Sequence, residues 1–439
     1  MAKHIVIIGN GIAGITCART LRKLSQDEIT VISSETDHFY SRTALMYIYM
    51  GHMKYEHTKP YEDWFWEKNR ISLVKDFVTL ISTDTKELHV KSGKIIKYDK
   101  LVIATGSVSN TPDIPGVALQ GVQTLYGMPD LEMMIRNTEN VKHAVVLGGG
   151  LIGIEMAEML LSQKISVTFL IRENAYWNNV LPAEEAEMVS RHIKEHHIDL
   201  RIATGLREIV GDSEGRVRSV ITDKGEEITT GFLGLTVGVS PNIGVIQGTG
   251  IKAGRGILVN EYFETNITDV YAIGDCAQHI NPPNGRKAVE QVWYTGKMQG
   301  ETLALTLHGK RTKYDPGIWY NSAKFFDIEY QTYGTVNAAA QQNEHSFYWE
   351  HKDSRISFRV VYNAETRAVT GFNAMGMRLR HAVCDKWIKE GRSVDEVMRN
   401  LQLVNFDAEF SRRYHNEMLE SYNVTAGVDL KNKGEVQSV

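Results

Sequence analysis

The stretch Gly9-Asn-Gly-Ile-Ala-Gly14 stands between the apolar run His4-Ile-Val-Ile-Ile8 and a helix-forming segment over 12–24. The apolar run is typical of a buried parallel strand. Gly9 permits a sharp turn, Gly11 lets a pyrophosphate approach the backbone because it has no Cβ, and Gly14 lets the helix pack on the strand. The N–H groups at the helix start then face the phosphates. The stretch therefore predicts a dinucleotide-binding unit.

The same arrangement occurs a second time in the chain. Gly148-Gly-Gly-Leu-Ile-Gly153 follows the strand-like run His143-Ala-Val-Val-Leu147 and leads into a predicted helix over 152–161. Gly148, Gly150 and Gly153 stand in the three roles just described. One such motif is also typical of a tight turn without a ligand, but its repetition in the same context favours nucleotide binding. Two units predict a protein that holds two dinucleotides and passes electrons between them.

The residues after the next strand distinguish the two units. In the first unit, Glu35 follows the strand 29–32 at the place, roughly 20 residues past the glycines, where an acid binds a ribose diol. In the second unit, Arg172 follows the strand 166–171. A guanidinium suits a 2′-phosphate and favours NADPH, whereas Gly153 is more common in NAD-type turns. The two indications conflict, so the sequence does not decide whether the second unit binds NADPH or NADH.

Composition excludes several classes of protein. The 439 residues are enough for two or three domains. The net charge is −4 and no Lys/Arg cluster stands out, so no nucleic-acid partner is expected. No apolar run approaches the roughly 18 residues that span a bilayer, so no membrane span is expected. The first strand begins at residue 4, which leaves no room for a cleavable presequence, and we expect a cytoplasmic protein.

Cysteine and histidine residues offer few further sites. The three cysteines, Cys17, Cys276 and Cys384, are far apart in sequence, which excludes storage of electrons on a Cys-x-x-Cys dithiol. His192 and His196 have the spacing of a helical metal-binding pair. Lys194 and Glu195 between them indicate a solvent-exposed helix instead. We therefore expect no metal site.

These motifs, in this order, resemble the FAD-dependent pyridine nucleotide oxidoreductases, the flavoproteins with two dinucleotide-binding folds. The chain looks most like the class of rubredoxin reductase, the ferredoxin reductases of oxygenase systems, the flavin part of assimilatory nitrite reductase and apoptosis-inducing factor. The resemblance covers residues 3–310 well and the rest loosely. It implies an enzyme with FAD in the first unit and NAD(P)H in the second. Hydride would pass to FAD and electrons onward to an external acceptor.

The resemblance also assigns site residues. The FAD set comprises the turn glycines, the ribose acid, a Tyr-x-Arg arginine, an Ala-Thr-Gly turn, a carboxylate for the ribityl chain and a segment facing the pyrimidine: Gly9, Gly11, Gly14, Glu35, Arg42, Ala104, Thr105, Gly106, Asp275, Glu290, Gln291 and Trp293. The NAD(P)H set is Gly148, Gly150, Gly153, Glu155, Arg172 and Gly238. Asp275 also fits by chemistry, because an acceptor-only carboxylate past a strand end suits hydroxyl donors. No side chain is expected to act as a catalytic nucleophile or base.

The expected fold class is α/β, with two Rossmann-like dinucleotide-binding domains and a C-terminal α+β domain. The FAD-binding domain spans 1–115 and 243–314, and the NAD(P)H-binding domain spans 116–242. The C-terminal domain covers 315–424, with strands at 318–326, 330–336, 345–350 and 355–362 and helices at 379–390 and 394–400. A polar tail follows over 425–439.

Two departures from the family pattern bear on the electron acceptor. Several relatives carry a lysine near the flavin, but here that stretch is Thr43-Ala-Leu-Met-Tyr47, so a lysine partner for Glu155 is missing. No cysteine lies between Cys17 and Cys276, which argues against reduction of disulfides or peroxide. A small iron–sulfur protein of the rubredoxin or ferredoxin type is the expected acceptor. The alternatives are an NAD(P)H oxidase or quinone reductase, and a flavin-bearing signalling protein similar to apoptosis-inducing factor. A homodimer stays open.

Overall fold

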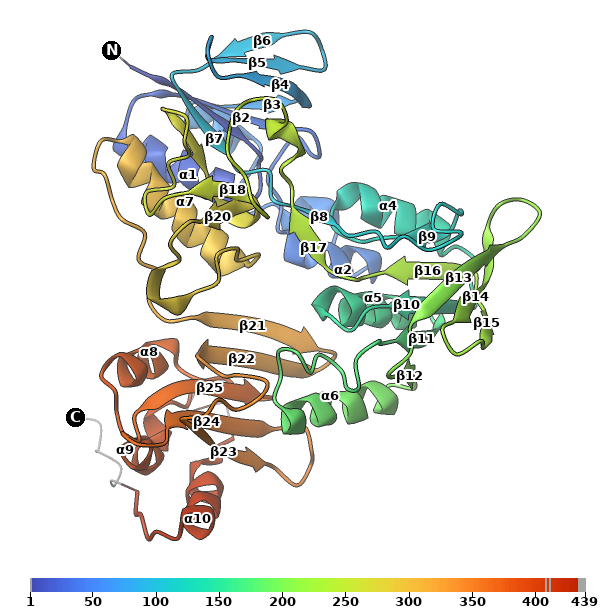
Figure 1. Cartoon of the computed structure of the whole chain (residues 1–439), viewed down its shortest axis with the longest axis vertical. Helices are drawn as coiled ribbons and strands as arrows, with labels where there is room; N and C mark the ends of the chain where they lie inside the picture. Colours follow the sequence, from blue (N-terminus) through green and yellow to red (C-terminus); the bar gives the residue numbers. More distant parts are fainter. Residues whose placement is uncertain (1, 407–408, 410–411, 433–439) are drawn as a thin grey trace.

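The computed structural model describes residues 2–406, 409 and 412–432, which fold around three main sheets (Figure 1). The first sheet is parallel throughout, in the order β19-β7-β1-β2-β3. Its strands are β1 (His4–Ile8), β2 (Glu28–Ser33), β3 (Ile71–Lys75), β7 (Lys100–Ile103) and β19 (Val270–Ala272). Because these strands are parallel, their carboxyl ends meet at one edge, where the segments carrying Gly9, Glu35, Ala104 and Asp275 begin.

Two helices pack tightly together beside this sheet. They are α1 (Ile12–Leu24) and α7 (Trp293–Leu307). A Cβ on Gly300 would lie 2.5 Å from the backbone oxygen of Ala13, so only glycine allows the close approach seen here. The contact places the start of α7 beside the first glycine turn, although the two are far apart in sequence (Figure 1).

The second sheet repeats the first, in the order β12-β11-β10-β16-β9. Its parallel strands are β9 (Val122–Gln123), β10 (His143–Leu147), β11 (Ser166–Leu170), β12 (Asp199–Arg201) and β16 (Phe232–Leu235). The accompanying helices are α4 (Met128–Asn137), α5 (Leu151–Ser162) and α6 (Ala183–Glu195). The chain crosses to this sheet and back through the antiparallel pair β8 (Ser107–Ser109) and β17 (Val239–Pro241). Both parallel sheets of the predicted α/β fold are thus confirmed.

Smaller elements surround the two sheets. The segment 201–230, in which apolar and polar residues alternate around Gly-containing turns, forms an antiparallel sheet of three strands. The remaining short elements are β4 (Val78–Ser82), β5 (Glu87–Val90), β6 (Ile95–Lys97), β13 (Leu206–Gly211), β14 (Val217–Thr222), β15 (Glu227–Thr229), β18 (Ile257–Val259), β20 (Ala277–His279), α2 (Leu45–Tyr49) and α3 (Trp64–Lys68).

The C-terminal region forms an antiparallel sheet in the order β21-β22-β25-β24-β23. Its elements are β21 (Tyr320–Phe325), β22 (Ile328–Gly334), β23 (Glu344–Glu350), β24 (Ser357–Asn363), β25 (Val369–Met375), α8 (His381–Lys389), α9 (Val394–Arg399) and α10 (His415–Ala426). The sequence analysis missed β25, because this inner strand is buried on both faces and lacks the alternation of a half-exposed strand. It also missed α10, which carries the chain beyond 425, where the polar tail was expected. Leu430 is buried as well, and the rest of that tail, 433–439, lies outside the described residues.

One helix begins later than predicted. The sequence over 287–308 is typical of one continuous helix, whereas α7 begins at Trp293 and Val292 is extended. The preceding residues are held by a buried ion pair between Arg286 and Glu290. Among the described residues, no helix is both long and apolar enough to cross a membrane.

Candidate functional site

The glycines of the first turn have three distinct environments. Gly9 has φ +115°, and a Cβ there would lie 2.1 Å from the backbone oxygen of Ala104. A Cβ on Gly14 would lie 2.1 Å from the backbone oxygen of Gly9, so both positions require glycine for folding. A Cβ on Gly11 would meet nothing within 4 Å. The open position is the one at which the motif brings a pyrophosphate close to the backbone.

The second turn has the same three environments. Gly148 has φ +117°, and its Cβ would lie 2.4 Å from the backbone oxygen of Thr236. A Cβ on Gly153 would lie 2.3 Å from the backbone oxygen of Gly148, while a Cβ on Gly150 would meet nothing within 4 Å. The equivalence predicted from the sequence therefore extends to the contacts around each glycine.

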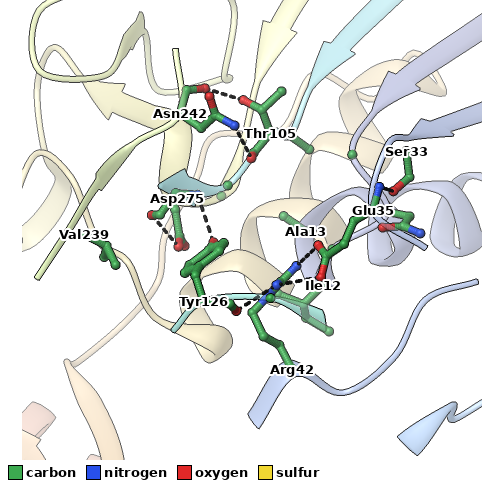
Figure 2. A pocket seen from close by; sticks show the side chains of 18 of the residues that line it. Ile12, Ala13, Ser33, Glu35, Arg42, Thr105, Tyr126, Val239, Asn242 and Asp275 are labelled. Atoms are coloured by element: carbon green, nitrogen blue, oxygen red, sulfur yellow. Dashed lines mark hydrogen bonds and ion pairs between the residues drawn. The ribbon is translucent and has the colours of Figure 1, made fainter. Parts of the chain in front are cut away.

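A cavity of about 720 Å³ opens beside the first turn, at the carboxyl edge of the first sheet (Figure 2). Eleven residues of the two predicted sets line it: Gly9, Gly11, Glu35, Arg42, Ala104, Thr105, Gly106, Glu155, Asp275, Gln291 and Trp293. The others are not among its lining residues: Gly14, Glu290, Gly148, Gly150, Gly153, Arg172 and Gly238. Glu155 belongs to α5, so this wall of the cavity comes from the second dinucleotide unit.

A chain of hydrogen bonds holds the carboxylate at the end of β19. Gln291 Nε2 donates to Ser107 Oγ at 2.7 Å, and that hydroxyl donates to Asp275 Oδ2 at 2.9 Å. The Ser107 N–H also donates to the Tyr126 hydroxyl at 2.9 Å. Burial raises the pKa of Asp275, and the bond from Ser107 offsets this only in part. A half-buried acceptor with one hydrogen-bond donor matches a ligand that brings hydroxyl groups.

Sequence reasoning missed both Ser107 and Tyr126. Ser107 follows the Ala-Thr-Gly turn directly, which is the one local signal that points to it. Tyr126 stands in a segment with no motif, and its ring lies 4.6 Å from the Arg42 guanidinium. Its part in the site depends on tertiary packing.

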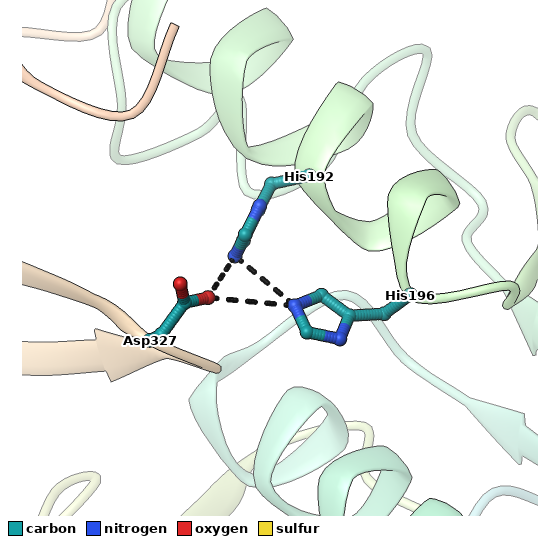
Figure 3. Close-up of side chains that lie close together, drawn as sticks. All are labelled: His192, His196 and Asp327. Carbon is teal, nitrogen blue, oxygen red and sulfur yellow. Dashed lines mark hydrogen bonds and ion pairs between the residues drawn. The ribbon is translucent and has the colours of Figure 1, made fainter. Parts of the chain in front are cut away.

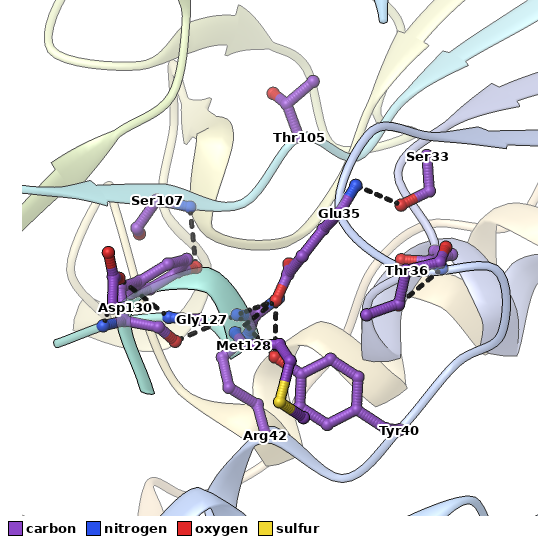
Figure 4. Close-up of polar contacts among 12 residues, drawn as sticks. Ser33, Glu35, Thr36, Tyr40, Arg42, Thr105, Ser107, Gly127, Met128 and Asp130 are labelled. Carbon is purple, nitrogen blue, oxygen red and sulfur yellow. Dashed lines mark hydrogen bonds and ion pairs between the residues drawn. The ribbon is translucent and has the colours of Figure 1, made fainter. Parts of the chain in front are cut away.

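Glu35, the acid predicted to bind a ribose, is part of a dense polar cluster (Figure 4). Arg42 Nη2 donates to Glu35 Oε2 at 2.7 Å, and the Tyr40 hydroxyl and the Met128 N–H donate to Oε1. Burial alone would raise the pKa of Glu35, but the hydrogen bond and charge of Arg42 outweigh it and hold that pKa below its usual value. Arg42 thus fixes the orientation of Glu35 as well as lining the cavity.

Three helix N-termini can donate to anions or carbonyl groups. The first turns of α1, α5 and α7 contain no acidic residue, and the cap residues Gly11, Gly150 and Val292 make no side-chain capping bond. The N–H groups at these ends lack intrahelical partners. Helices α1 and α5 therefore suit two pyrophosphates, and α7 suits a polar ring edge.

Glu155 is a further carboxyl group of the cavity wall whose pKa is shifted by its surroundings. Burial raises the pKa of Glu155 to about 7, with Glu158 adding to the shift and Lys324 opposing it. Lys324 comes from β21 in the C-terminal region, and its Nζ lies 3.0 Å from Glu158 Oε1. The sequence analysis noted no lysine partner near residues 43–47. The structure brings a lysine into this neighbourhood from a distant strand instead.

Glu290 does not reach the cavity, unlike its neighbour Gln291. Arg286 holds both oxygens of Glu290, with Nε–Oε1 at 2.6 Å and Nη2–Oε2 at 2.7 Å, and both side chains are buried. Glu290 thus fixes the segment before α7. Arg172 differs again, because 86% of its side chain is exposed and its contact with Glu173 is long, at 3.8 Å. Its guanidinium remains accessible to a ligand on the second unit.

The expectation of an exposed histidine face on α6 is wrong for His192. The His192 side chain is 1% exposed, because it packs against Phe326 and bonds Asp327 from the C-terminal region (Figure 3). The partners are distant in sequence, so the intervening Lys194 and Glu195 gave a misleading indication. His197, which follows this pair in sequence, is exposed.

Comparison with known proteins places these features in one family. Residues 3–300 match the family described as pyridine nucleotide-disulphide oxidoreductase. Nitrite reductase [NAD(P)H] of Bacillus subtilis is 29% identical over 345 residues, 77% of this chain but only 42% of that relative. The NADH oxidase of Methanocaldococcus jannaschii is 31% identical over 339 residues, 74% of each chain.

Two further likenesses extend the comparison. The ferredoxin reductase component of chlorobenzene dioxygenase from Cupriavidus sp. is 28% identical over 312 residues, 71% of this chain and 75% of that one. The solved structure of an NAD-dependent persulfide reductase from A. fulgidus has a TM-score of 0.83 at 22% identity and covers 99% of this chain and 88% of its own. The latter likeness shows the fold.

The two glycine turns, and the cavity that the first turn forms with residues of the second unit, are typical of a flavoprotein oxidoreductase. The chain belongs to the pyridine nucleotide-disulphide oxidoreductase family. It is an FAD-dependent NAD(P)H oxidoreductase, as its predicted resemblance implied.

Proposed function

We propose that this protein carries electrons from NAD(P)H, through FAD held in the cavity beside the first turn, to a small iron–sulfur protein. The observation that carries the proposal is the 720 Å³ cavity, whose wall combines the first glycine turn, Asp275 and Glu155 of the second unit. FAD, when bound, supplies a hydride acceptor that can release electrons onward.

The described residues fit FAD at its two ends. Gly11 leaves backbone space for the pyrophosphate beside the uncapped start of α1. Asp275, half-buried with Ser107 as its hydrogen-bond donor, would accept hydrogen bonds from the hydroxyl groups of the ribityl chain. The N–H groups at the start of α7 would orient the pyrimidine edge and favour its reduced, anionic form. These residues bind and orient, and none acts as a nucleophile.

The choice of acceptor rests on what the cavity wall lacks. No cysteine is among its described lining residues. Cys276 adjoins Asp275, but it is fully buried and its Sγ donates to the backbone oxygens of Ile103 and Ile273. Burial also raises its pKa, which disfavours the reactive thiolate. A route through a thiol, as disulfide or persulfide chemistry requires, is therefore disfavoured. The ferredoxin reductase relative supports an iron–sulfur partner.

Direct reduction of oxygen is the second candidate, because the relative from Methanocaldococcus jannaschii is named an NADH oxidase. Turnover of the FAD-loaded protein by NADPH, with and without rubredoxin or ferredoxin, separates the two. We expect electron delivery to the carrier to exceed oxygen uptake at least about tenfold. If NADPH is consumed in air as fast without a carrier as with one, the protein is an oxidase. Slow turnover under both conditions, with a long-lived reduced complex, would identify a signalling protein. The cytoplasmic location stays a prediction, and the oligomeric state stays open.

Removal of the Arg172 charge tests the nicotinamide preference. We expect Arg172→Ala to raise KM for NADPH roughly tenfold and KM for NADH little, because the guanidinium pairs only with the 2′-phosphate. Steady-state kinetics with both cofactors measure the effect. Arg207→Ala, a change at another exposed arginine of this region, is the control. Equal loss with both cofactors would mean that Arg172 does not bind the phosphate.

A pH profile tests Glu155. With its pKa raised to about 7, the carboxyl is neutral below that pH and charged above it. The carboxylate would stabilise the positive charge that develops on the nicotinamide as hydride leaves, so we expect reduction to quicken roughly fivefold between pH 6 and 8. Stopped-flow measurement of flavin bleaching checks this. In Glu155→Gln the rate of flavin reduction should no longer change with pH. In Glu158→Gln the rate should still rise with pH. A rise that persists in Glu155→Gln would contradict the assignment.

A further inference from the structure

A cluster outside the cavity brings three metal-binding side chains to one point. His192 and His196 lie one turn apart at the end of α6, and Asp327 lies in the turn between β21 and β22 (Figure 3). His192 Nε2 is 2.6 Å from Asp327 Oδ1, His196 Nε2 is 3.4 Å from the same oxygen, and the two nitrogens are 3.3 Å apart. We propose that this cluster is a binding site for a divalent transition metal ion of the zinc class.

The spacing of the three atoms fits such an ion. Zinc bonds of about 2.0–2.2 Å in a tetrahedron place neighbouring ligand atoms roughly 3.3 Å apart. Two of the three distances between the ligand atoms already have this length. The third, between His192 and Asp327, is a hydrogen-bond distance and would open by roughly 0.7 Å. Two imidazoles and one carboxylate leave the fourth position for water or an external ligand.

The hydrogen-bond contacts of His192 also favour a cation at the centre of the cluster. His192 faces a carboxylate at each ring nitrogen, with Glu195 Oε2 3.4 Å from Nδ1 and Asp327 Oδ1 2.6 Å from Nε2. Neutral histidine carries one N–H, so it can donate to only one of them. When Nε2 carries a proton or binds a metal ion, Nδ1 can keep its own N–H and donate it to Glu195, so both contacts are satisfied. In the metal-bound form, Glu195 orients His192 through its Nδ1–H, as carboxylates commonly do for histidine ligands.

The surrounding structure holds the ligands in place. The Phe326 ring stacks on His196, with centroids 4.0 Å apart and planes 13° from parallel. Phe326 has φ +55°, a costly conformation for a bulky residue, and it forms the two-residue turn with Asp327. Arg355 Nη1 lies 3.3 Å from Asp327 Oδ2, which leaves Oδ1 for the ion. The side chains of His196 and Asp327 are 36% and 56% exposed, so an ion can enter from solvent.

A metal ion here would join two regions of the chain. The histidines belong to the helix that flanks the second sheet, and Asp327 belongs to the C-terminal region. Binding would therefore stabilise their contact, and the thermal midpoint would rise by about 5 °C at an ion concentration near 100 times Kd. This site is separate from the flavin cavity and does not depend on the identity of the electron acceptor.

Equilibrium dialysis of the chelator-treated, FAD-loaded protein against Zn²⁺ or Co²⁺ tests the proposal. We expect one ion per chain at micromolar concentrations, together with a visible Co²⁺ spectrum of low coordination number. His196→Gln and Asp327→Asn should each weaken binding at least roughly 100-fold. His197→Gln, a change at the adjacent exposed histidine, should leave it unchanged. Absence of saturable binding, or an affinity in His196→Gln and Asp327→Asn equal to that of the unchanged protein, would show that the cluster is only a hydrogen-bonded contact.

Discussion

Gly11→Val is expected to give a folded protein that no longer retains FAD. Gly11 has φ −71° and ψ −179°, which any residue adopts, and a Cβ there meets no protein atom within 4 Å. The new methyl groups would instead occupy the space where the motif brings the pyrophosphate to the backbone. Overpacking of about 3 kcal/mol corresponds to roughly 100-fold weaker FAD binding. Fluorescence titration of the apoprotein with FAD measures the change, and circular dichroism verifies the fold.

The chain contains its own control for this experiment. Gly150 is the equivalent position of the second turn, with extended backbone and the same open surroundings. We expect Gly150→Val to retain FAD and to raise KM for NAD(P)H at least tenfold. Loss of FAD in both variants, or in neither, would contradict the assignment of the two turns to different cofactors.

Arg359→Ala is expected to destabilise the contact between α6 and the C-terminal sheet by about 3–5 kcal/mol. Arg359 donates to Glu185 Oε1 at 2.7 Å and Oε2 at 2.8 Å, and to Glu184 Oε2 at 2.7 Å. The side chains of Arg359 and Glu185 are 6% and 0% exposed, so removing the guanidinium leaves a buried carboxylate without its cation. Urea unfolding followed by tryptophan fluorescence reports the loss.

Arg378→Ala is the matched control for that ion pair. Arg378 pairs with Glu329 on the same sheet, but the two side chains are 55% and 42% exposed. Exposed pairs contribute less than about 1 kcal/mol, so we expect a small change in the unfolding midpoint. Similar losses in Arg359→Ala and Arg378→Ala would contradict the role given to the buried cluster.

The site residues that could be predicted from the sequence are those whose role depends only on a short segment of the chain. A strand, a turn and a helix in succession require glycine at fixed places, so Gly9, Gly14, Gly148 and Gly153 identify both units without any partner. Glu35 and Asp275 were found in the same way, because each follows a strand whose carboxyl end faces the cavity. The two parallel sheets follow from these units.

The parts that were missed depend on residues far apart in sequence. Ser107 joins Gln291 to Asp275 only after β8 and α7 have packed. Burial of His192 depends on Asp327, and the environment of Glu155 on Lys324, both from the C-terminal sheet. Glu290 directly precedes the cavity residue Gln291, yet its side chain is held away from the cavity by the ion pair with Arg286. Periodicity and motif spacing carry no signal for such contacts.

Anaerobic titration of the purified protein with NADH and NADPH, followed by visible absorbance, tests the central claim most directly. We expect a yellow protein whose flavin bands bleach with about one equivalent of either cofactor, more readily with NADPH, and recover when an oxidised rubredoxin or ferredoxin is added. A colourless protein that takes up no FAD, or bound flavin that neither nicotinamide reduces, would contradict the account.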